Sequence, residues 1–113
     1  MKVNFWKYQG TGNDFVIFDN RERKLPTNDK DLWAKVCDRN YGVGADGILF
    51  LEESKNADLK MVYLNSDGGE VAMCGNGARC LLGFAKNLGH LTSESGTLET
   101  RDETYKFMFK DIV

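Results

Sequence analysis

The stretch NGARCLLGFAKNLG, residues 76–89, decides the fold that the sequence predicts. Its apolar members recur at helical spacing and cover almost the whole circumference of a helix; they are Ala78, Cys80, Leu81, Leu82, Phe84, Ala85 and Leu88. A helix that is apolar on every side must be buried. Gly89 is the expected C-terminal stop, because glycine readily adopts the left-handed conformation that ends many helices. The sequence therefore predicts a central buried helix over residues 76–88.

Six short segments with strand character surround this helix in the sequence. They are residues 3–8, 14–19, 48–51, 59–64, 97–101 and 105–109. The run FVIF, residues 15–18, is apolar without interruption, which fits a strand that is buried on both faces. The third and fourth segments are predicted to pair as a hairpin, and the last two flank a turn at residues 102–103. Strands around one central apolar helix predict an α+β fold.

A second helix is predicted over residues 29–39, where apolar residues again recur at helical spacing. These residues are Leu32, Trp33, Val36 and Cys37. Thr27 or Asn28 is the expected N-cap, and Gly42 ends the pattern. Because Cys37 belongs to the apolar stripe, we interpret it as a small core residue and not as a reactive thiol.

The glycine-rich loop GVGADG, residues 42–47, could be mistaken for a nucleotide-binding fingerprint. A dinucleotide-binding loop follows a strand and opens a helix. This loop follows a helix and opens a strand, so the sequence does not favour nucleotide binding.

Length and composition restrict the class of protein. The 113 residues suit one compact domain, and 42% hydrophobic with 28% charged residues can supply a core. The net charge of −2 offers no basic surface for nucleic acid or an anionic membrane. The chain opens on Met-Lys without an apolar targeting segment, so we expect a soluble cytoplasmic protein that acts on a small molecule.

The three cysteines do not suggest a disulfide scaffold or a metal site. Cys74 and Cys80 are six residues apart, which on a helix is a rise of roughly 9 Å and exceeds the reach of a disulfide. No Cys-x-x-Cys motif occurs and His90 is the only histidine, so a structural zinc site lacks ligands. Reduced thiols and no bound metal are expected, and Cys80 is interpreted as a core residue because it lies within the apolar helix.

The stretch NSDGGEVAMCGNGARC, residues 65–80, carries the predicted chemistry because it places Cys74 at the start of the central helix. The first N–H groups of a helix lack partners within the helix and lie at its positive end, so they bind carboxylates and favour a thiolate. Gly75 and Gly77 would let a ligand approach the backbone, and Asn76 adds a side-chain amide. The stretch predicts an anion-binding site beside a reactive sulfur.

A thiolate beside a bound carboxylate can remove the proton on the adjacent α carbon, while helix N–H groups stabilise the charge that develops. Nucleophilic use of Cys74 would need a nearby histidine. His90 lies at the opposite end of the predicted helix, about 20 Å away at a rise of about 1.5 Å per residue. From the residues alone, an incidental structural thiol at a helix start remains an equal alternative for Cys74.

Three motifs together resemble the diaminopimelate epimerase family. They are GTGNDF at residues 10–15, Asp38-Arg39 followed by GVGADG, and the stretch 65–80 with its MCGNGARC core. The resemblance covers nearly the whole chain. It implies a diaminopimelate-epimerase-like domain with strands wrapped around a central hydrophobic helix, in which residues 1–113 form the amino-terminal domain and the family's second domain is missing.

The resemblance also implies the roles of site residues. Cys74 would be one of two thiols on opposite sides of the α carbon of LL- or meso-diaminopimelate, with no pyridoxal phosphate or other cofactor. The implied substrate contacts come from Asn13, Asn65, Gly75 and Asn76. From the residues alone, turn formation would be the preferred role of Asn13 and Asn65.

The chain departs from the family pattern in two ways. Many members carry a substrate-contacting glutamine where this sequence has Gly47. The second thiol and an assisting histidine and glutamate belong to the family's second domain, and His90 does not match that histidine. The family closes its first domain with a distant strand, so residues 1–113 alone would expose a sheet edge, and we expect a homodimer or aggregation.

Two alternatives to a diaminopimelate epimerase remain open. The first is a related cofactor-independent racemase of another amino acid, which the missing glutamine at Gly47 suggests. The second is a carboxylate-binding or self-assembling module without turnover, which the short chain suggests.

Overall fold

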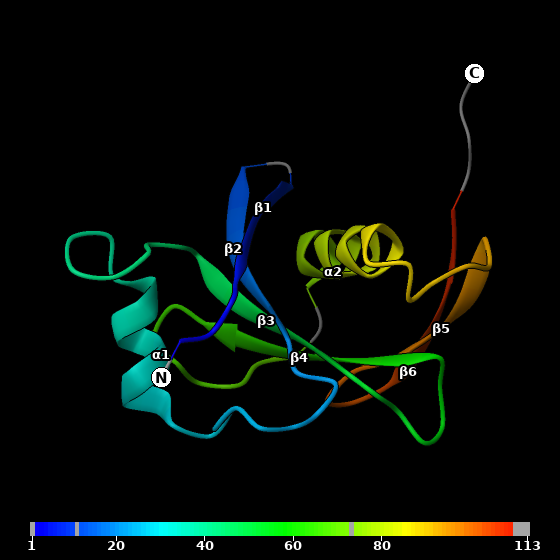
Figure 1. Ribbon diagram of the computed structural model, residues 1–113, viewed down its shortest axis with the longest axis horizontal. Helices are drawn as coiled ribbons and strands as arrows, with labels where there is room; N and C mark the ends of the chain where they lie inside the picture. The colour runs from blue at the N-terminus through cyan, green and yellow to red at the C-terminus, as the bar shows by residue number, and fades with distance from the viewer. Residues whose placement is uncertain (1, 11, 73, 110–113) are drawn as a thin grey trace.

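The computed structural model describes residues 2–10, 12–72 and 74–109 (Figure 1). Thr11 and Met73, which belong to the motifs quoted above, lie outside the described residues. The described elements, in chain order, are β1 (Trp6–Gly10), β2 (Asn13–Asp19), α1 (Lys30–Cys37), β3 (Gly47–Glu52), β4 (Leu59–Asn65), α2 (Gly75–Asn87), β5 (Ser95–Glu99) and β6 (Thr104–Met108). They confirm the predicted α+β class.

The strands form one mixed sheet in the order β1-β2-β3-β4-β5-β6. Three antiparallel hairpins, β1–β2, β3–β4 and β5–β6, are joined by two parallel contacts, β2–β3 and β4–β5. The hairpin predicted between the third and fourth segments is therefore confirmed. Each parallel contact needs a crossover connection, and α1 and α2 provide these two crossovers.

The two helices pack on opposite faces of the sheet. One crossover leads from β2 to β3 and the other from β4 to β5, and both advance in the same direction across the sheet. Because β4 runs opposite to β2, right-handed crossovers place the two helices on different faces. Side chains of β3 alternate accordingly: Leu49 and Leu51 join the core with α2, whereas Ile48 and Phe50 join the core with α1. Both faces of β3 are thus buried, and the same holds for residues 15–18 of β2, as predicted.

Helix α1 covers its face of the sheet with aromatic and thiol side chains. The ring centroid of Trp33 lies 5.1 Å from that of Phe18 and 5.0 Å from that of Phe50. Cys37 is buried in this core, which confirms its predicted role. The N-cap is neither Thr27 nor Asn28 but Asp29, whose carboxylate accepts a hydrogen bond from the Leu32 N–H at 3.3 Å.

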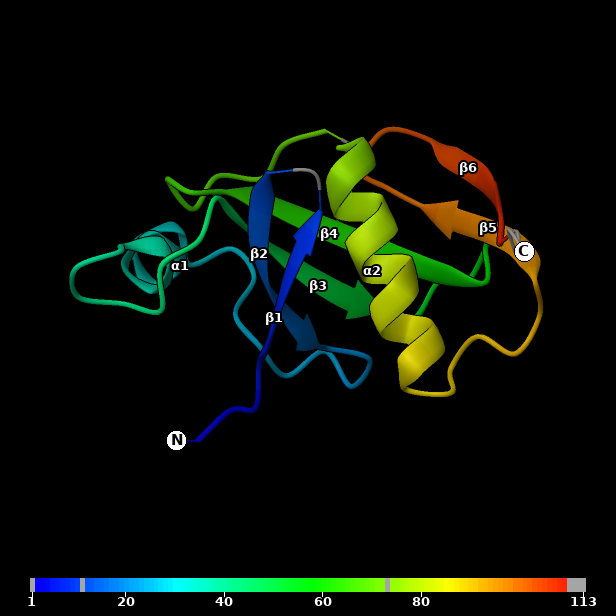
Figure 2. The same ribbon diagram turned by 90° about the horizontal axis from the view of Figure 1, so that it is seen from above.

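Helix α2 lies across the opposite face, between β1 on one side and β5 on the other (Figure 2). Its buried residues are Gly77, Ala78, Cys80, Leu81, Phe84 and Ala85, so Cys80 is a core residue, as predicted. Arg79, Lys86, Asn87 and Leu88 are exposed on its other side. The predicted all-round burial is therefore found on one side only, because within the described residues no element packs over the other side. Gly89 has φ +78° and ends the helix as predicted.

The terminal strands begin elsewhere than predicted. Strand β1 starts at Trp6, whereas Val3 and Phe5 are exposed and outside the ladder. At its other end the strand runs two residues further than predicted, because Gly10 pairs with Asn13. Strands β5 and β6 lie one to two residues earlier than predicted. Neither described helix has the length and apolar character required to cross a membrane.

Candidate active site

Cys74 is the N-cap residue of α2, as predicted. Its backbone is extended, with φ −116° and ψ 126°, and its carbonyl accepts the first helical hydrogen bond, from the Ala78 N–H at 2.8 Å. The thiol makes no capping hydrogen bond, and the side chain is only partly buried. The sulfur is therefore not used to satisfy the helix and is partly open to a ligand.

The two glycines after Cys74 have different roles. At Gly75 an added Cβ would meet no atom within 4 Å, so the backbone is open to a ligand, as predicted. At Gly77 an added Cβ would lie 3.2 Å from Cδ2 of Leu49 and 3.7 Å from Cε1 of Phe15. The predicted ligand approach at Gly77 is therefore wrong: this glycine lets the first turn of α2 pack closely on the sheet.

The structure brings Asn13 and Asn76 together. Nδ2 of Asn76 donates a 2.8 Å hydrogen bond to Oδ1 of Asn13, although the residues are 63 positions apart. The end of β1 also packs on the start of α2, since a Cβ added at Gly10 would lie 3.6 Å from the carbonyl oxygen of Asn76 and 3.1 Å from Sγ of Cys80. Two side chains implied as substrate contacts thus meet at the end of α2 that carries Cys74.

Asn65, the last residue of β4, takes part in a turn. Its N–H donates to the Gly69 carbonyl at 2.9 Å, and its carbonyl accepts from the Gly68 N–H at 2.9 Å. Gly68 has φ +85°, a conformation that glycine adopts without strain. This geometry fits the turn role expected from the residues alone. Among the described residues, no hydrogen bond joins the Asn65 side chain to Asn13 or Asn76, so its substrate contact stays a prediction.

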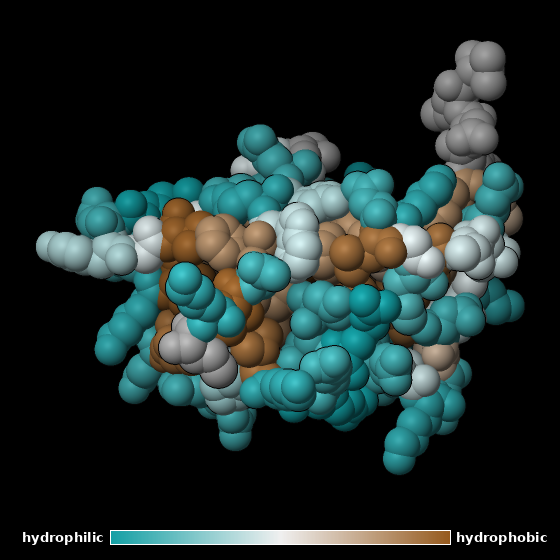
Figure 3. All heavy atoms as spheres, viewed as in Figure 1, coloured by the Kyte–Doolittle hydropathy of each residue, from teal (hydrophilic) through white to brown (hydrophobic). Residues whose placement is uncertain are grey.

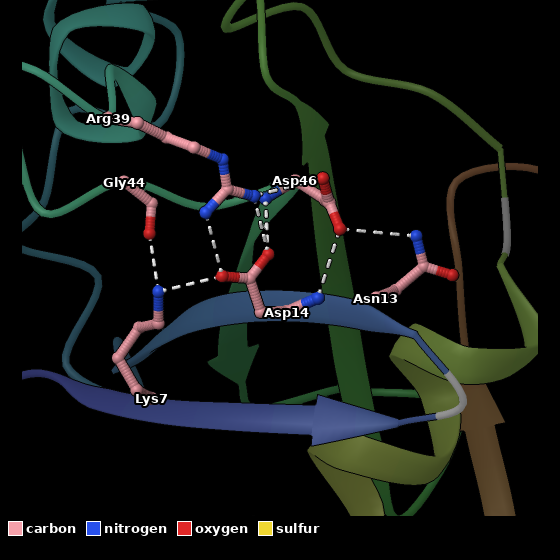
Figure 4. Close-up of polar contacts among 6 residues, drawn as sticks. All are labelled: Lys7, Asn13, Asp14, Arg39, Gly44 and Asp46. Carbon is pink, nitrogen blue, oxygen red and sulfur yellow. Dashed lines mark hydrogen bonds and ion pairs between the residues drawn. The ribbon is translucent and has the colours of Figure 1, made fainter.

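A cluster of charged side chains lies beside Asn13 and was not identified from the sequence (Figure 4). Arg39 binds the Asp14 carboxylate with both terminal nitrogens, at 2.9 and 3.2 Å, and reaches Oδ1 of Asp46 at 3.1 Å. Lys7 donates to Asp14 at 2.9 Å and also to the carbonyl of Gly44. The cluster therefore fastens β1 and β2 to the loop that precedes β3.

Each of the two aspartates of this cluster also binds the backbone N–H of the other with its carboxylate. The Asp14 N–H donates to Oδ2 of Asp46 at 3.1 Å, and the Asp46 N–H donates to Oδ1 of Asp14 at 3.0 Å. Arg39 contributes most to holding the pKa of the Asp14 carboxyl far below its ordinary value of 3.8, against the opposing effect of burial. The signal available in the sequence was the pair of Asp residues at the starts of two parallel strands.

Burial raises the pKa of two other thiols and of one tyrosine in this domain. Burial raises the pKa of the Cys37 thiol to about 11. Burial also raises the pKa of Cys80, as does the charge of Cys74. The pKa of Tyr63 is raised first by burial and then by Cys74, and both side chains pack against the core under α2. Tyr63 is therefore a neighbour of the thiol that sequence reasoning missed.

His90 is remote from Cys74, as predicted. It follows α2 at its C-terminal end, where its Nδ1 lies 3.1 Å from Nη1 of Arg21. A histidine-activated nucleophile at Cys74 is thus not formed by His90. Among the described residues, no group of three or more His, Cys, Asp or Glu side chains is arranged to hold a metal ion.

Comparison with solved structures places this fold among known proteins. A crystal structure of a Bacillus anthracis phenazine biosynthesis protein of the PhzF family aligns with a TM-score of 0.74, covers 96% of this chain and 36% of that one, and is 24% identical. A crystal structure of a methylitaconate-delta-isomerase aligns with a TM-score of 0.69 at 13% identity, over 98% of this chain and 61% of that one. These likenesses concern the fold alone.

Sequence relatives identify the family. The sequence model of the family described as diaminopimelate epimerase matches residues 5–112. A diaminopimelate epimerase from Flavobacterium psychrophilum is 50% identical over 82% of this chain, and one from Rippkaea orientalis is 47% identical over 94%. The chain spans 36% of the length of each of these two relatives. From its motifs, its fold and these relatives, the chain belongs to the diaminopimelate epimerase family.

Proposed function

We propose that residues 1–113 form the amino-terminal domain of a pyridoxal-phosphate-independent diaminopimelate epimerase, which interconverts LL- and meso-diaminopimelate in lysine and peptidoglycan biosynthesis. The carrying observation is the position of Cys74, whose partly exposed thiol stands at the start of α2 next to the open backbone of Gly75. Since the chain spans 36% of its relatives' length, the activity belongs to the full-length protein.

The proposed reaction is a proton transfer at the α carbon. The Cys74 thiolate removes the proton, so the C–H bond breaks, an S–H bond forms and the electron pair moves into the substrate carboxylate. The N–H groups at the start of α2 would bind that carboxylate and stabilise the added charge. A second thiol, supplied from outside residues 1–113, would deliver a proton to the opposite face and complete the inversion. No cofactor is needed in this scheme.

Substrate contacts are proposed at four residues of this domain. The backbone at Gly75 is open to a carboxylate, and the joined amides of Asn13 and Asn76 lie at the same end of α2. Asn65, the last residue of β4, pairs with Gly47, the first residue of β3. Asn65 therefore lies beside the loop that contains Asp46. Together these residues offer donors and acceptors to a zwitterionic amino acid.

We propose that further chain completes this domain and covers the exposed side of α2, so that strands surround a central helix in the full-length protein. Apolar side chains remain exposed on residues 1–113; examples are Val3, Phe5, Trp6, Val43 and Met108. Hydrophobic residues are also visible at the surface in Figure 3. Such surface, together with the sheet edges at β1 and β6, supports a homodimer. The proposed location is the cytoplasm, without nucleic-acid or membrane partners.

The test is α-proton exchange of diaminopimelate in deuterated water, catalysed by the full-length protein. Cys74→Ala should abolish epimerisation and the exchange from the face of the substrate that Cys74 serves, because the base on that face is lost. Cys37→Ala is the matched control: it removes a thiol in the core under α1 and should keep exchange, provided that circular dichroism shows folded protein. Undiminished exchange in Cys74→Ala would contradict the proposal.

A second candidate is a cofactor-independent racemase of another amino acid, which Gly47 favours because it lacks the glutamine of many family members. Turnover of a panel of amino acids by the full-length protein separates the two candidates. A preferred substrate other than diaminopimelate would select the racemase. Binding of diaminopimelate without exchange of its α proton would instead select a non-catalytic carboxylate-binding module.

A further inference from the structure

The side-chain amide of Asn13 is held at both ends. Its Nδ2 donates to Oδ2 of Asp46 at 3.4 Å, and its Oδ1 accepts from Nδ2 of Asn76 at 2.8 Å (Figure 4 shows the first contact). A carboxylate only accepts hydrogen bonds, so it selects the nitrogen end of the amide. The reversed amide would set its oxygen against the Asp46 carboxylate and its NH₂ group against that of Asn76. The hydrogen-bond chain from Asp46 to Asn76 therefore has one direction.

The carboxylate of Asp46 is itself fixed in place. Its Oδ1 accepts from Arg39 at 3.1 Å, and its Oδ2 accepts from the Asp14 N–H at 3.1 Å. The Asp46 N–H donates to both the carbonyl and Oδ1 of Asp14, each at 3.0 Å. Arg39 in turn donates hydrogen bonds from two nitrogens to the Asp14 carboxylate. The orientation of the Asp46 carboxylate is thus set by Asp14 of β2 and by Arg39, two residues after the end of α1.

We infer that Asp46 is a positioning residue. It fixes the orientation of the Asn13 amide and, through Asn13, the orientation of the Asn76 amide. The start of α2 therefore presents one constant pattern of hydrogen-bond donors and acceptors to an amino acid. Because Nδ2 of Asn76 donates to Asn13, Oδ1 of Asn76 is the atom that can accept a hydrogen bond from an ammonium group or another donor. The N–H groups at the start of α2 would bind the carboxylate of the amino-acid ligand. The role of the ligand in this inference rests on the proposed function.

Preorganisation of this kind lowers the cost of binding, because the amides need not be ordered when the ligand arrives. Loss of Asp46 should therefore weaken substrate binding more than the chemical step. Asp46 does not need to touch the substrate for this effect. Asn13 is the only residue through which the described hydrogen bonds connect Asp46 to Asn76, so the effect must depend on Asn13.

A double-mutant cycle on the full-length protein tests this dependence. Asp46→Ala should raise KM for diaminopimelate about 10-fold, the change that loss of one hydrogen bond to a charged group produces. In the Asn13→Ala background, Asp46→Ala should raise KM less than about 2-fold further. An equal increase in both backgrounds would show a general structural role and overturn the inference. Glu22→Gln, at an exposed ion pair with Lys24, is the control and should leave KM unchanged.

Nuclear magnetic resonance of the 113-residue chain provides a readout that does not depend on activity. Asp46→Ala should shift the side-chain NH₂ signals of both Asn13 and Asn76, whereas Glu22→Gln should not. Unshifted signals would overturn the inference even in an active enzyme. If the wild-type protein is not an epimerase but the signals shift, the proposed function fails and the positioning role stands. Should Asp46→Ala not fold, Asp46→Asn keeps the shape, removes the charge and should produce smaller shifts of the same signals.

Discussion

Gly47 faces Tyr63 so closely that a Cβ at position 47 would lie 2.9 Å from Cε1 of the tyrosine ring and 2.8 Å from the carbonyl oxygen of Leu64. The same ring packs edge-on against Phe15, at 6.0 Å between centroids. The space where a side chain at position 47 would begin is therefore already filled. This contact gives a physical reason for glycine at position 47.

Substitution of Gly47 should consequently cost stability. Gly47→Gln forces both the Tyr63 ring and the β4 backbone to move, and overpacking of this kind costs about 1–3 kcal/mol. Urea unfolding followed by circular dichroism measures the change. Gly75→Ala is the matched control, since its added Cβ meets nothing within 4 Å; it should leave stability unchanged or raise it by up to about 1 kcal/mol. Equal stability of Gly47→Gln and the unmodified chain would contradict the clash.

The ion pairs of Asp14 should make stability depend on pH in the acid range. The folded state lowers the pKa of Asp14 below 3.8, chiefly through Arg39, so folding favours the ionised carboxylate. This contribution to stability is fully present above the ordinary pKa and is lost as pH falls below it towards the folded pKa.

Asp14→Asn should therefore reduce stability at neutral pH and flatten its dependence on pH below about 4. Urea unfolding at a series of pH values checks both effects. The pKa of Asp19 is likewise lowered by Arg21, but this pair is present in both proteins, so the difference between the two curves isolates Asp14. Parallel curves for the two proteins would argue against a role for Asp14 in this pH range.

The charge of Cys74 should be detectable at Tyr63. The pKa of Tyr63 is raised above 10.0, first by burial and second by Cys74. Cys74→Ala removes both the charge and the hydrogen-bonding group that oppose ionisation of the phenol, so the pKa of Tyr63 should fall towards 10.0 without reaching it, because burial remains. Carbon-13 labelling of the tyrosine Cζ atoms resolves this residue from the other three tyrosines in a pH titration. An unchanged Tyr63 titration would show that the two groups do not interact.

Local patterns in the sequence were sufficient to predict the two helices, the β3–β4 hairpin and the position of Cys74. They succeeded because helical periodicity and glycine punctuation are encoded in neighbouring residues. The contact between Asn13 and Asn76 could not be predicted in this way. It depends on the pairing of Gly10 with Asn13 and on the packing of Gly10 against Asn76 at the start of α2, which is a tertiary arrangement.

The charged cluster was missed for the same reason. Asp14 and Asp46 become neighbours only when β2 and β3 pair in parallel, and Arg39 joins them through the loop after α1. The apolar pattern of α2 led to the opposite error. It predicted burial on every side, but Leu88 is partly exposed at the end of the helix, and the polar Arg79, Lys86 and Asn87 mark a side that the described residues leave open.

The three thiols should differ in reactivity towards an alkylating reagent. Cys37 is 4% exposed, with its pKa raised to about 11, and Cys80 is 6% exposed. Cys74 is only partly buried and makes no capping hydrogen bond. Because alkylation needs an accessible thiolate, Cys74 should be the single site modified in the folded chain.

Iodoacetamide treatment near neutral pH, followed by mass spectrometry of peptides, measures this selectivity. The folded chain should gain one label, on Cys74, and the urea-unfolded chain should gain three. Folded Cys74→Ala should gain none, which distinguishes selective reaction from slow labelling of the core. Rapid native labelling of Cys80 would mean that the first turn of α2 opens readily. In that case Gly10 and Asn76 would not hold the start of the helix against β1, and the geometry of the proposed site would lose its support.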